Sequence, residues 1–295
     1  MYNIHINVVK HNFLNLSVNI IYLMRWILVR LIFVSLTIIL ITVMPVLGAW
    51  RPSTQYQRPI SGGYKLDIDR WYFTSGVYDH KGFCTIGYVA LSPQGEHGYV
   101  SAGHCIEGTL NGHNWVWRFY QPNHYRRTTY YAGFPKYVYG SFNYIDTLFS
   151  KYDDVSARIL TLNLVGYPVL APVIGYYSWY SIHQDKDLNI MDIIKTGYAS
   201  GVTSGSYLRS YESVITSSGT LYKFLILFDY ESANGDSGGP VYTLIHKRID
   251  ASWEAYAKLI GIHIGLFNYG EYGIVRGAIS ADGIFIETGI RPMVI

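Results

Sequence analysis

The sequence is poor in charge and in cysteine. Of 295 residues, only 15% are charged while 49% are hydrophobic, which excludes a chain kept disordered by charge. Lys and Arg number 23 against 20 Asp and Glu, a net charge of +3 that is too weak for a nucleic-acid binder. Two cysteines exclude a disulfide-built mini-protein and a thiolate metal cluster, but allow one bridge.

Motifs for metals and phosphates are also missing. The ten histidines include His97, His104, His113 and His124, whose spacing is irregular. There is no His-Glu-x-x-His, no Cys-x-x-Cys and no glycine-rich phosphate loop, whereas a catalytic zinc needs three convergent ligands. The sequence therefore predicts neither a metal nor a cofactor.

One long apolar run is present, from Leu31 to Trp50. Twenty residues without a charge are long enough to span a bilayer, and Arg25 and Arg30 on the N-terminal side predict that the following chain is translocated. Cleavage at Val46-Leu47-Gly48 or Leu47-Gly48-Ala49 would make this run a signal peptide, and without cleavage it is a signal anchor. Both readings place the rest of the chain outside the cell, secreted or anchored.

Three regions follow from this pattern. Residues 1–50 form the N-terminal tail and membrane segment, residues 51–63 (RPSTQYQRPISGG) read as a linker or short propeptide, and residues 64–295 form the folded domain. After residue 60 there is no sustained helical stripe and no repeat. Short runs rich in Tyr, Val, Ile and Thr instead predict antiparallel β structure, at 85–91, 98–101, 115–120, 155–162, 193–196, 221–230, 240–245 and 258–264.

The sharpest motif is Asn-Gly-Asp-Ser-Gly-Gly-Pro-Val at 234–241. A nucleophilic serine needs a tight turn with converging amides, and Gly235 and Gly238 can adopt conformations that residues with a Cβ rarely reach. The motif resembles the nucleophile loop of chymotrypsin-like serine proteases. This resemblance implies that Ser237 is the nucleophile and that the amides of Gly235 and Ser237 form the oxyanion hole, with Asp236 as a spacer.

A second motif, Tyr-Val-Ser-Ala-Gly-His-Cys at 99–105, resembles the histidine segment of the same family. It implies that His104 is the general base, a task suited to an imidazole near neutral pH. In the bacterial, streptogrisin-like branch a cysteine about twenty residues earlier bridges to the one after the histidine, which implies a Cys84–Cys105 disulfide. The hairpin at 195–205 (KTGYASGVTSG) extends the resemblance, and Ile60-Ser-Gly-Gly63 resembles the mature start of several members.

The third member of the triad must be an ionised carboxylate that orients the imidazole. Asp154, in Asp-Val-Ser-Ala-Arg-Ile, resembles the family pattern at the start of a strand and is favoured. Asp153 would point to the opposite side of such a strand, and Asp146 could precede an apolar strand of its own. These two remain as alternatives.

The substrate pocket carries conflicting signals. Gly261-Ile-His-Ile-Gly265 resembles the strand that lines it, so His263 and Gly265 are candidate substrate-binding residues, and a histidine at this position implies an acidic substrate side chain. Glu231, six residues before Ser237, instead implies a basic one. Ile264 and Leu266 depart from the small residues that the branch usually has there.

Taken together, the resemblance implies an all-β fold of two six-stranded antiparallel β-barrels. It also implies a serine endopeptidase that acts on polypeptides through Ser237, His104 and Asp154, without a cofactor. The alternative is a pseudoprotease, a binding module that keeps the fold without turnover. The two differ in whether mutation of Ser237 abolishes hydrolysis.

Overall fold

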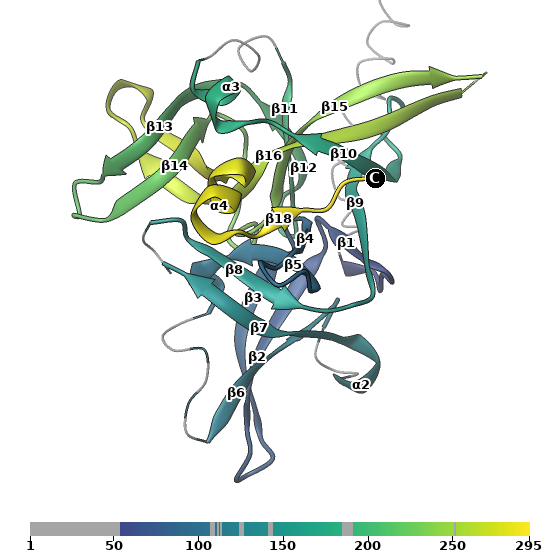
Figure 1. The fold of residues 1–295 in the computed structure, drawn as a ribbon, viewed down its shortest axis with the longest axis vertical. Helices are drawn as coiled ribbons and strands as arrows, with labels where there is room; N and C mark the ends of the chain where they lie inside the picture. The colour runs from purple at the N-terminus through teal and green to yellow at the C-terminus, as the bar shows by residue number, and fades with distance from the viewer. Residues whose placement is uncertain are drawn as a thin grey trace, which may run out of the picture. The chain divides into compact units, whose positions relative to one another are not determined.

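The computed structural model describes residues 54–106, 110, 112, 114–123, 127–140, 144–184, 191–250 and 252–295. They form one folded unit that is dominated by β-strands (Figure 1). The strands are β1 (Ile60–Gly62), β2 (Lys65–Tyr72), β3 (Tyr78–Thr85), β4 (Val89–Leu91), β5 (His97–Ala102), β6 (Trp115–Tyr120), β7 (Tyr131–Tyr139), β8 (Thr147–Lys151), β9 (Val155–Leu162), β10 (Pro168–Tyr176), β11 (Ile193–Gly197), β12 (Gly201–Gly205), β13 (Tyr207–Ile215), β14 (Leu221–Phe228), β15 (Pro240–Ile249), β16 (Ser252–Asn268), β17 (Ile274–Ser280) and β18 (Arg291–Pro292). The helices are α2 (Arg127–Tyr130), α3 (Trp179–His183) and α4 (Ala281–Thr288), with 3-10 turns at Gly103–Cys105 and Gly270–Tyr272.

The strands form two sheets. One has eight strands in the order β18-β4-β5-β8-β7-β6-β2-β3, and the other has ten, running from β1 through β9, β10, β16, β15 and β11 to β12, with β17, β14 and β13 branching from β16. The prediction of a mainly antiparallel all-β chain is confirmed, although β1 pairs with β9 and β10 with β16 in parallel. The sheets are larger than the six strands expected for each half, because additional strands and long hairpins extend them.

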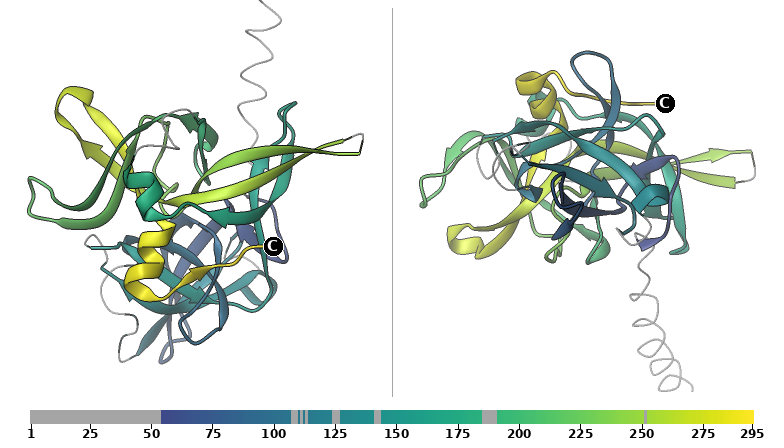
Figure 2. Two further views of the ribbon diagram at one scale, coloured as in Figure 1. Left: turned by 45° about the horizontal axis from the view of Figure 1, so that its top comes forward. Right: turned by 90° about the horizontal axis from the view of Figure 1, so that it is seen from below.

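The buried side chains form two clusters, and each contains residues from both sheets. Tyr99 and Trp117 of the eight-stranded sheet share one cluster with Ile60 of β1, and Tyr242 of the ten-stranded sheet shares the other with Val100 of β5. Burying such aromatic and β-branched side chains gives most of the driving force for folding. The β15–β16 hairpin extends beyond the rest of the folded unit in every view (Figures 1 and 2).

The run predicted as one strand at 85–91 is divided at Gly87. A Cβ on Gly87 would lie 2.6 Å from the carbonyl oxygen of Gly238 and 2.8 Å from that of Val100. Only a residue without a side chain lets these three backbones approach so closely. Gly87 therefore brings the eight-stranded sheet against the loop that carries the Gly-Asp-Ser-Gly motif.

The segment 51–63, expected to be a linker, contains regular and buried structure in the part that the structure describes. Ile60–Gly62 is the buried strand β1, and the Arg58 guanidinium donates to Gln121 Oε1 at 2.8 Å and to the Tyr131 carbonyl at 2.9 Å. The segment is polar in composition, but its one large aliphatic residue, Ile60, is only 1% exposed and anchors it. The folded part thus begins before Tyr64.

The predicted membrane segment at 31–50 lies outside the described residues. Among the residues that the structure does describe, no helix has the length and apolar character needed to cross a membrane.

Cys84 and Cys105 form a disulfide, as the resemblance implied, with their Cα atoms 6.2 Å apart. The bridge joins the end of β3 to the turn that follows β5, and 21 positions separate the two residues. It therefore ties His104, the neighbour of Cys105, to the adjacent hairpin.

Replacing both cysteines with serine should lower the free energy of unfolding by about 3 kcal/mol, because the open loop gains entropy in the unfolded chain. Urea denaturation measures this change. Wild-type protein treated with dithiothreitol is the matched control and should unfold at the same urea concentration as the double variant. Equal stability of reduced and oxidised wild type would contradict the assignment.

Candidate active site

His104 is held by Asp146 through two hydrogen bonds. Asp146 Oδ2 lies 2.7 Å from His104 Nδ1, and Oδ1 accepts the His104 backbone amide at 2.8 Å. The carboxylate is almost fully buried, with 1% of its side chain exposed, while 15% of the imidazole is exposed. With Nδ1 directed at a buried carboxylate, Nε2 is the ring nitrogen that points away from Asp146.

Strand pairing brings these two residues together. β5 pairs antiparallel with β8 so that Ala102 lies opposite Thr147. The residues just after β5 and just before β8 are therefore neighbours in space. Asp146 has a φ of 36°, a conformation rare for residues with a side chain, which turns its carboxylate back toward His104.

Asp154, the favoured third member, does not contact His104 in the structure, which has Asp146 at that place instead. It is exposed at the start of β9, where its carbonyl accepts the Ile60 amide at 2.8 Å, and Asp153 beside it is also exposed. β9 belongs to the ten-stranded sheet, whereas His104 follows a strand of the eight-stranded sheet. The remaining alternative, Asp146, could be recognised as an aspartate directly before an apolar strand.

Ser237 lies beside the residue that follows His104. Its carbonyl oxygen accepts the Thr85 amide at 2.8 Å and lies 4.0 Å from Sγ of Cys105. The Ser237 side chain is partly exposed. The fold thus brings the serine motif and the histidine motif, more than a hundred positions apart in the chain, to one place.

Two glycines shape the loop around Ser237. Gly235 has a φ of 104° and Gly238 a φ of 87°, as the motif predicts. A Cβ on Gly238 would lie 2.1 Å from Ser101 Oγ, so a larger residue would separate the loop from β5. Within the described part of the chain, the amides of Gly235 and Ser237 donate to no protein acceptor. Both are therefore available to a ligand oxygen.

Asp236 is more than a spacer. It is completely buried and forms an ion pair with Lys195 Nζ at 2.6 Å. Its carboxylate also accepts the amides of Ala199, Ser200 and Ala233 at 2.9, 3.1 and 2.9 Å, and the Ser200 hydroxyl at 2.5 Å. These contacts fix the residue next to Ser237 to the β11–β12 hairpin.

The charges of this pair depend on each other. Burial alone would raise the pKa of Asp236. The positive charge and hydrogen bond of Lys195, and the hydrogen bonds from Ser200 and Ala233, outweigh this effect and hold the pKa below its usual value. Burial lowers the pKa of Lys195, and the attraction of Asp236 opposes this shift. The sequence identified the hairpin at 195–205 but not this ion pair, because the partners are 41 positions apart.

His263 and Gly265 lie on β16 beside the loop. The His263 carbonyl accepts the Gly238 amide at 2.7 Å, and the His263 amide donates to the Gly239 carbonyl at 2.8 Å. The side chain of His263 is buried, with Nδ1 3.1 Å from the Tyr230 hydroxyl. Burial lowers the pKa of His263 to about 3, with a further contribution from Lys195, so the imidazole is neutral at physiological pH.

Glu231 is exposed, and its carbonyl accepts the Thr203 hydroxyl at 2.8 Å. The interpretation of Glu231 as an acidic pocket floor therefore has no support in the geometry. Ile264 is nearly buried and Leu266 is 58% exposed, and both line a hollow of about 570 Å³ between β16 and the β13–β14 hairpin.

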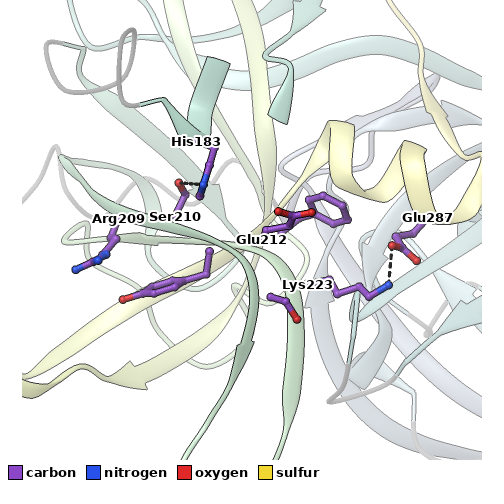
Figure 3. A pocket seen from close by; sticks show the side chains of 9 residues that line it. His183, Arg209, Ser210, Glu212, Lys223 and Glu287 are labelled. Carbon is purple, nitrogen blue, oxygen red and sulfur yellow. Dashed lines mark hydrogen bonds and ion pairs between the residues drawn. The ribbon is translucent and has the colours of Figure 1, made fainter. Parts of the chain in front are cut away.

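Another hollow, of about 500 Å³, lies among β13, β14, α3 and α4 (Figure 3). Lys223 is paired with Glu287 at 2.8 Å there, and His183 Nδ1 lies 3.3 Å from Ser210 Oγ. None of the predicted site residues lines it. The candidate active site is therefore separate from this hollow.

One group of side chains in the described part of the chain has the spacing of metal ligands: Asp67, Asp69 and His80. His80 Nδ1 lies 2.9 and 3.2 Å from the two carboxylates, and Lys65 Nζ lies 3.9 Å from Asp67. With a lysine and a histidine already facing the carboxylates, we describe the group as an ion-pair cluster on β2 and β3.

Solved structures share this fold. Protease A of Thermobifida fusca is 17% identical with a TM-score of 0.51, and a chymotrypsin of Cellulomonas bogoriensis is 18% identical with a TM-score of 0.50; each comparison covers 80% of this chain and 99% of the other. A serine protease described as glutamic acid specific, with a histidine triad in substrate binding, is 16% identical over 79% of this chain and 100% of its own, with a TM-score of 0.51. The fold is therefore chymotrypsin-like and of the bacterial, streptogrisin type. No protein-family model and no curated protein sequence matches the chain.

Replacing Lys195 with methionine should lower the free energy of unfolding by ~3–5 kcal/mol, because Asp236 would remain as a buried charge without its partner. Chemical denaturation measures this loss. The double variant K195M/D236N should recover part of it, since no isolated charge remains.

The control is Lys223→Met, which removes a partly exposed lysine paired with Glu287 and should change stability by less than ~1 kcal/mol. A K195M variant as stable as K223M would show that the ion pair contributes little.

Proposed function

We propose that the protein is an exported or membrane-anchored serine endopeptidase. The observation that carries the proposal is the buried Asp146–His104 pair beside the loop of Ser237. We interpret the two sheets as the two β-barrels of this fold, and His104, Asp146 and Ser237 as the catalytic triad. The Cys84–Cys105 disulfide supports an oxidising compartment outside the cell.

The proposed reaction runs through an acyl-enzyme. Ser237 Oγ attacks the peptide carbonyl while its proton passes to His104 Nε2, and the carbonyl oxygen becomes an oxyanion held by the amides of Gly235 and Ser237. The C–N bond then breaks and the amine leaves with the proton from His104. Water, deprotonated by His104, attacks the ester and releases the acid and Ser237.

Asp146 supports each proton transfer. Its ionised carboxylate keeps the proton of neutral His104 on Nδ1 and stabilises the imidazolium after Nε2 has accepted the serine proton. The Lys195–Asp236 pair supports the oxyanion hole by fixing the residue between its two donors. Preorganised donors need no rearrangement during the reaction.

A fluorophosphonate probe tests the nucleophile. Wild-type protein should be labelled and should hydrolyse casein, whereas Ser237→Ala should do neither while keeping the wild-type circular dichroism spectrum. Labelling that persists in S237A would refute the assignment of Ser237. Wild-type protein that is folded but neither labelled nor active would instead be the binding module with an inactive site.

A matched pair of variants tests whether Asp146 is the carboxylate of the proposed triad. Asp146→Asn should lower kcat by roughly 10³–10⁴-fold, because the amide stabilises the wrong tautomer of His104 and does not compensate its charge. Asp154→Asn, an equivalent change at an exposed position, should leave kcat within about twofold. Steady-state hydrolysis of one peptide substrate measures both values. The reverse order of effects would restore Asp154 as the triad member.

A further inference from the structure

Arg276 lies where the strand of the nucleophile loop and the candidate substrate strand meet. It belongs to β17, between β14 and β16, and pairs with Phe228 on one side and Leu266 on the other. β14 leads directly into the loop of Ser237, and β16 carries His263 and Gly265. The sequence motifs did not single out this arginine.

The charge of Arg276 acts on the groups at the base of the loop. It contributes to lowering the pKa values of Lys195 and His263, and it also influences Tyr230. Val275 and Gly277, its neighbours along the strand, lie on one face, where a Cβ on Gly277 would meet Phe267 and Leu225. Alternation along the strand directs the side chain of Arg276 to the other face, which it shares with Ala278, the residue paired with His263.

No ion pair joins the guanidinium to any carboxylate whose side chain the structure describes. Nη1 donates to the Ile274 carbonyl at 3.3 Å, and the buried Nε has no acceptor in the described part of the chain. Asp236 is committed to Lys195, and Glu231 is exposed. A partly buried arginine of this kind is a binding group for a carboxylate, which accepts two parallel hydrogen bonds from the planar guanidinium.

His263 does not supply this charge, because its imidazole is neutral and its Nδ1 is engaged by Tyr230. A neutral histidine can add a hydrogen bond to a bound carboxylate but not the electrostatic attraction. Arg276 is therefore the cation available beside the loop.

On the basis of the proposed function, we propose that Arg276 determines specificity and selects peptides with aspartate or glutamate directly before the scissile bond. The carboxylate of that side chain pairs with the guanidinium, while the backbone of the substrate lies along β16 near Gly265. The exposed Glu231 then lies outside the pocket and does not repel the substrate.

Fluorogenic peptides that differ only in the residue before the scissile bond test this inference on the full-length protein. The wild-type kcat/KM should be about 100-fold higher for Glu or Asp than for Gln or Asn, because an isosteric amide leaves the arginine without its charged partner. Arg276→Gln should abolish this preference while hydrolysis of the neutral peptides continues. Arg276→Lys should retain part of the preference. Arg158→Gln, at an exposed position on β9, is the matched control and should behave as wild type.

The pH dependence separates Arg276 from His263. The ratio of kcat/KM for Glu over Gln should stay constant between about pH 6 and 9, since arginine remains charged throughout. A ratio that falls as the pH rises would assign the selection to a histidine and overturn the inference.

Fluorophosphonate labelling separates failure of this inference from failure of the proposed function. Labelled wild type with no acidic preference, or labelled R276Q that keeps the preference, would overturn the role of Arg276 and leave the endopeptidase intact. Wild type that is neither labelled nor active would overturn both. Labelling of R276Q also shows that the variant is folded at its active site.

Discussion

The buried ion pair between Lys195 and Asp236 is the constraint on which the candidate site depends. A loop that exposes two unpaired amides and a partly exposed serine has little tendency to hold that shape alone, because its backbone gains hydrogen bonds by rearranging. Five donors converge on the Asp236 carboxylate and prevent this. Removing two charges from water is costly, and the convergence of these hydrogen bonds offsets that cost. The stability of this buried ion pair is therefore coupled to the positions of the Gly235 and Ser237 amides.

A second constraint is the contact between the two sheets. Gly87 and Gly238 allow backbones of both sheets to approach within van der Waals distance, and the Thr85 amide and hydroxyl bind the Ser237 and Gly235 carbonyls at 2.8 Å. The eight-stranded sheet supplies His104 and Asp146, and the loop between β14 and β15 supplies Ser237. Small shifts between the sheets would therefore separate His104, the proposed base, from Ser237, the proposed nucleophile, so the close packing at the two glycines supports the proposed chemistry.

The charge state and the partner of each ionisable residue around the Ser237 loop depend on how deeply that residue is buried. Asp236 is paired with Lys195, Glu231 is exposed, and burial keeps His263 neutral, whereas Arg276 forms no ion pair with any carboxylate whose side chain the structure describes. Residues that look equivalent in a sequence thus have different electrostatic roles. Under the proposed function, substrate selection would occur in the same region as the oxyanion hole, because β16 and β17 lie beside the loop of Ser237.

The sequence by itself determined the β-rich fold class, the disulfide through a family resemblance, and the motifs of Ser237 and His104, because these depend on local composition and on turns that require glycine. It also gave β6 and β9 their correct bounds. Only the tertiary structure placed Asp146 rather than Asp154 beside His104, placed Ile60 in a strand, paired Lys195 with Asp236, and suggested the proposed role of Arg276. Each of these depends on which strands pair, in which register, and on how deeply a charge is buried. Such properties arise between segments that are far apart in the chain, so no local pattern records them.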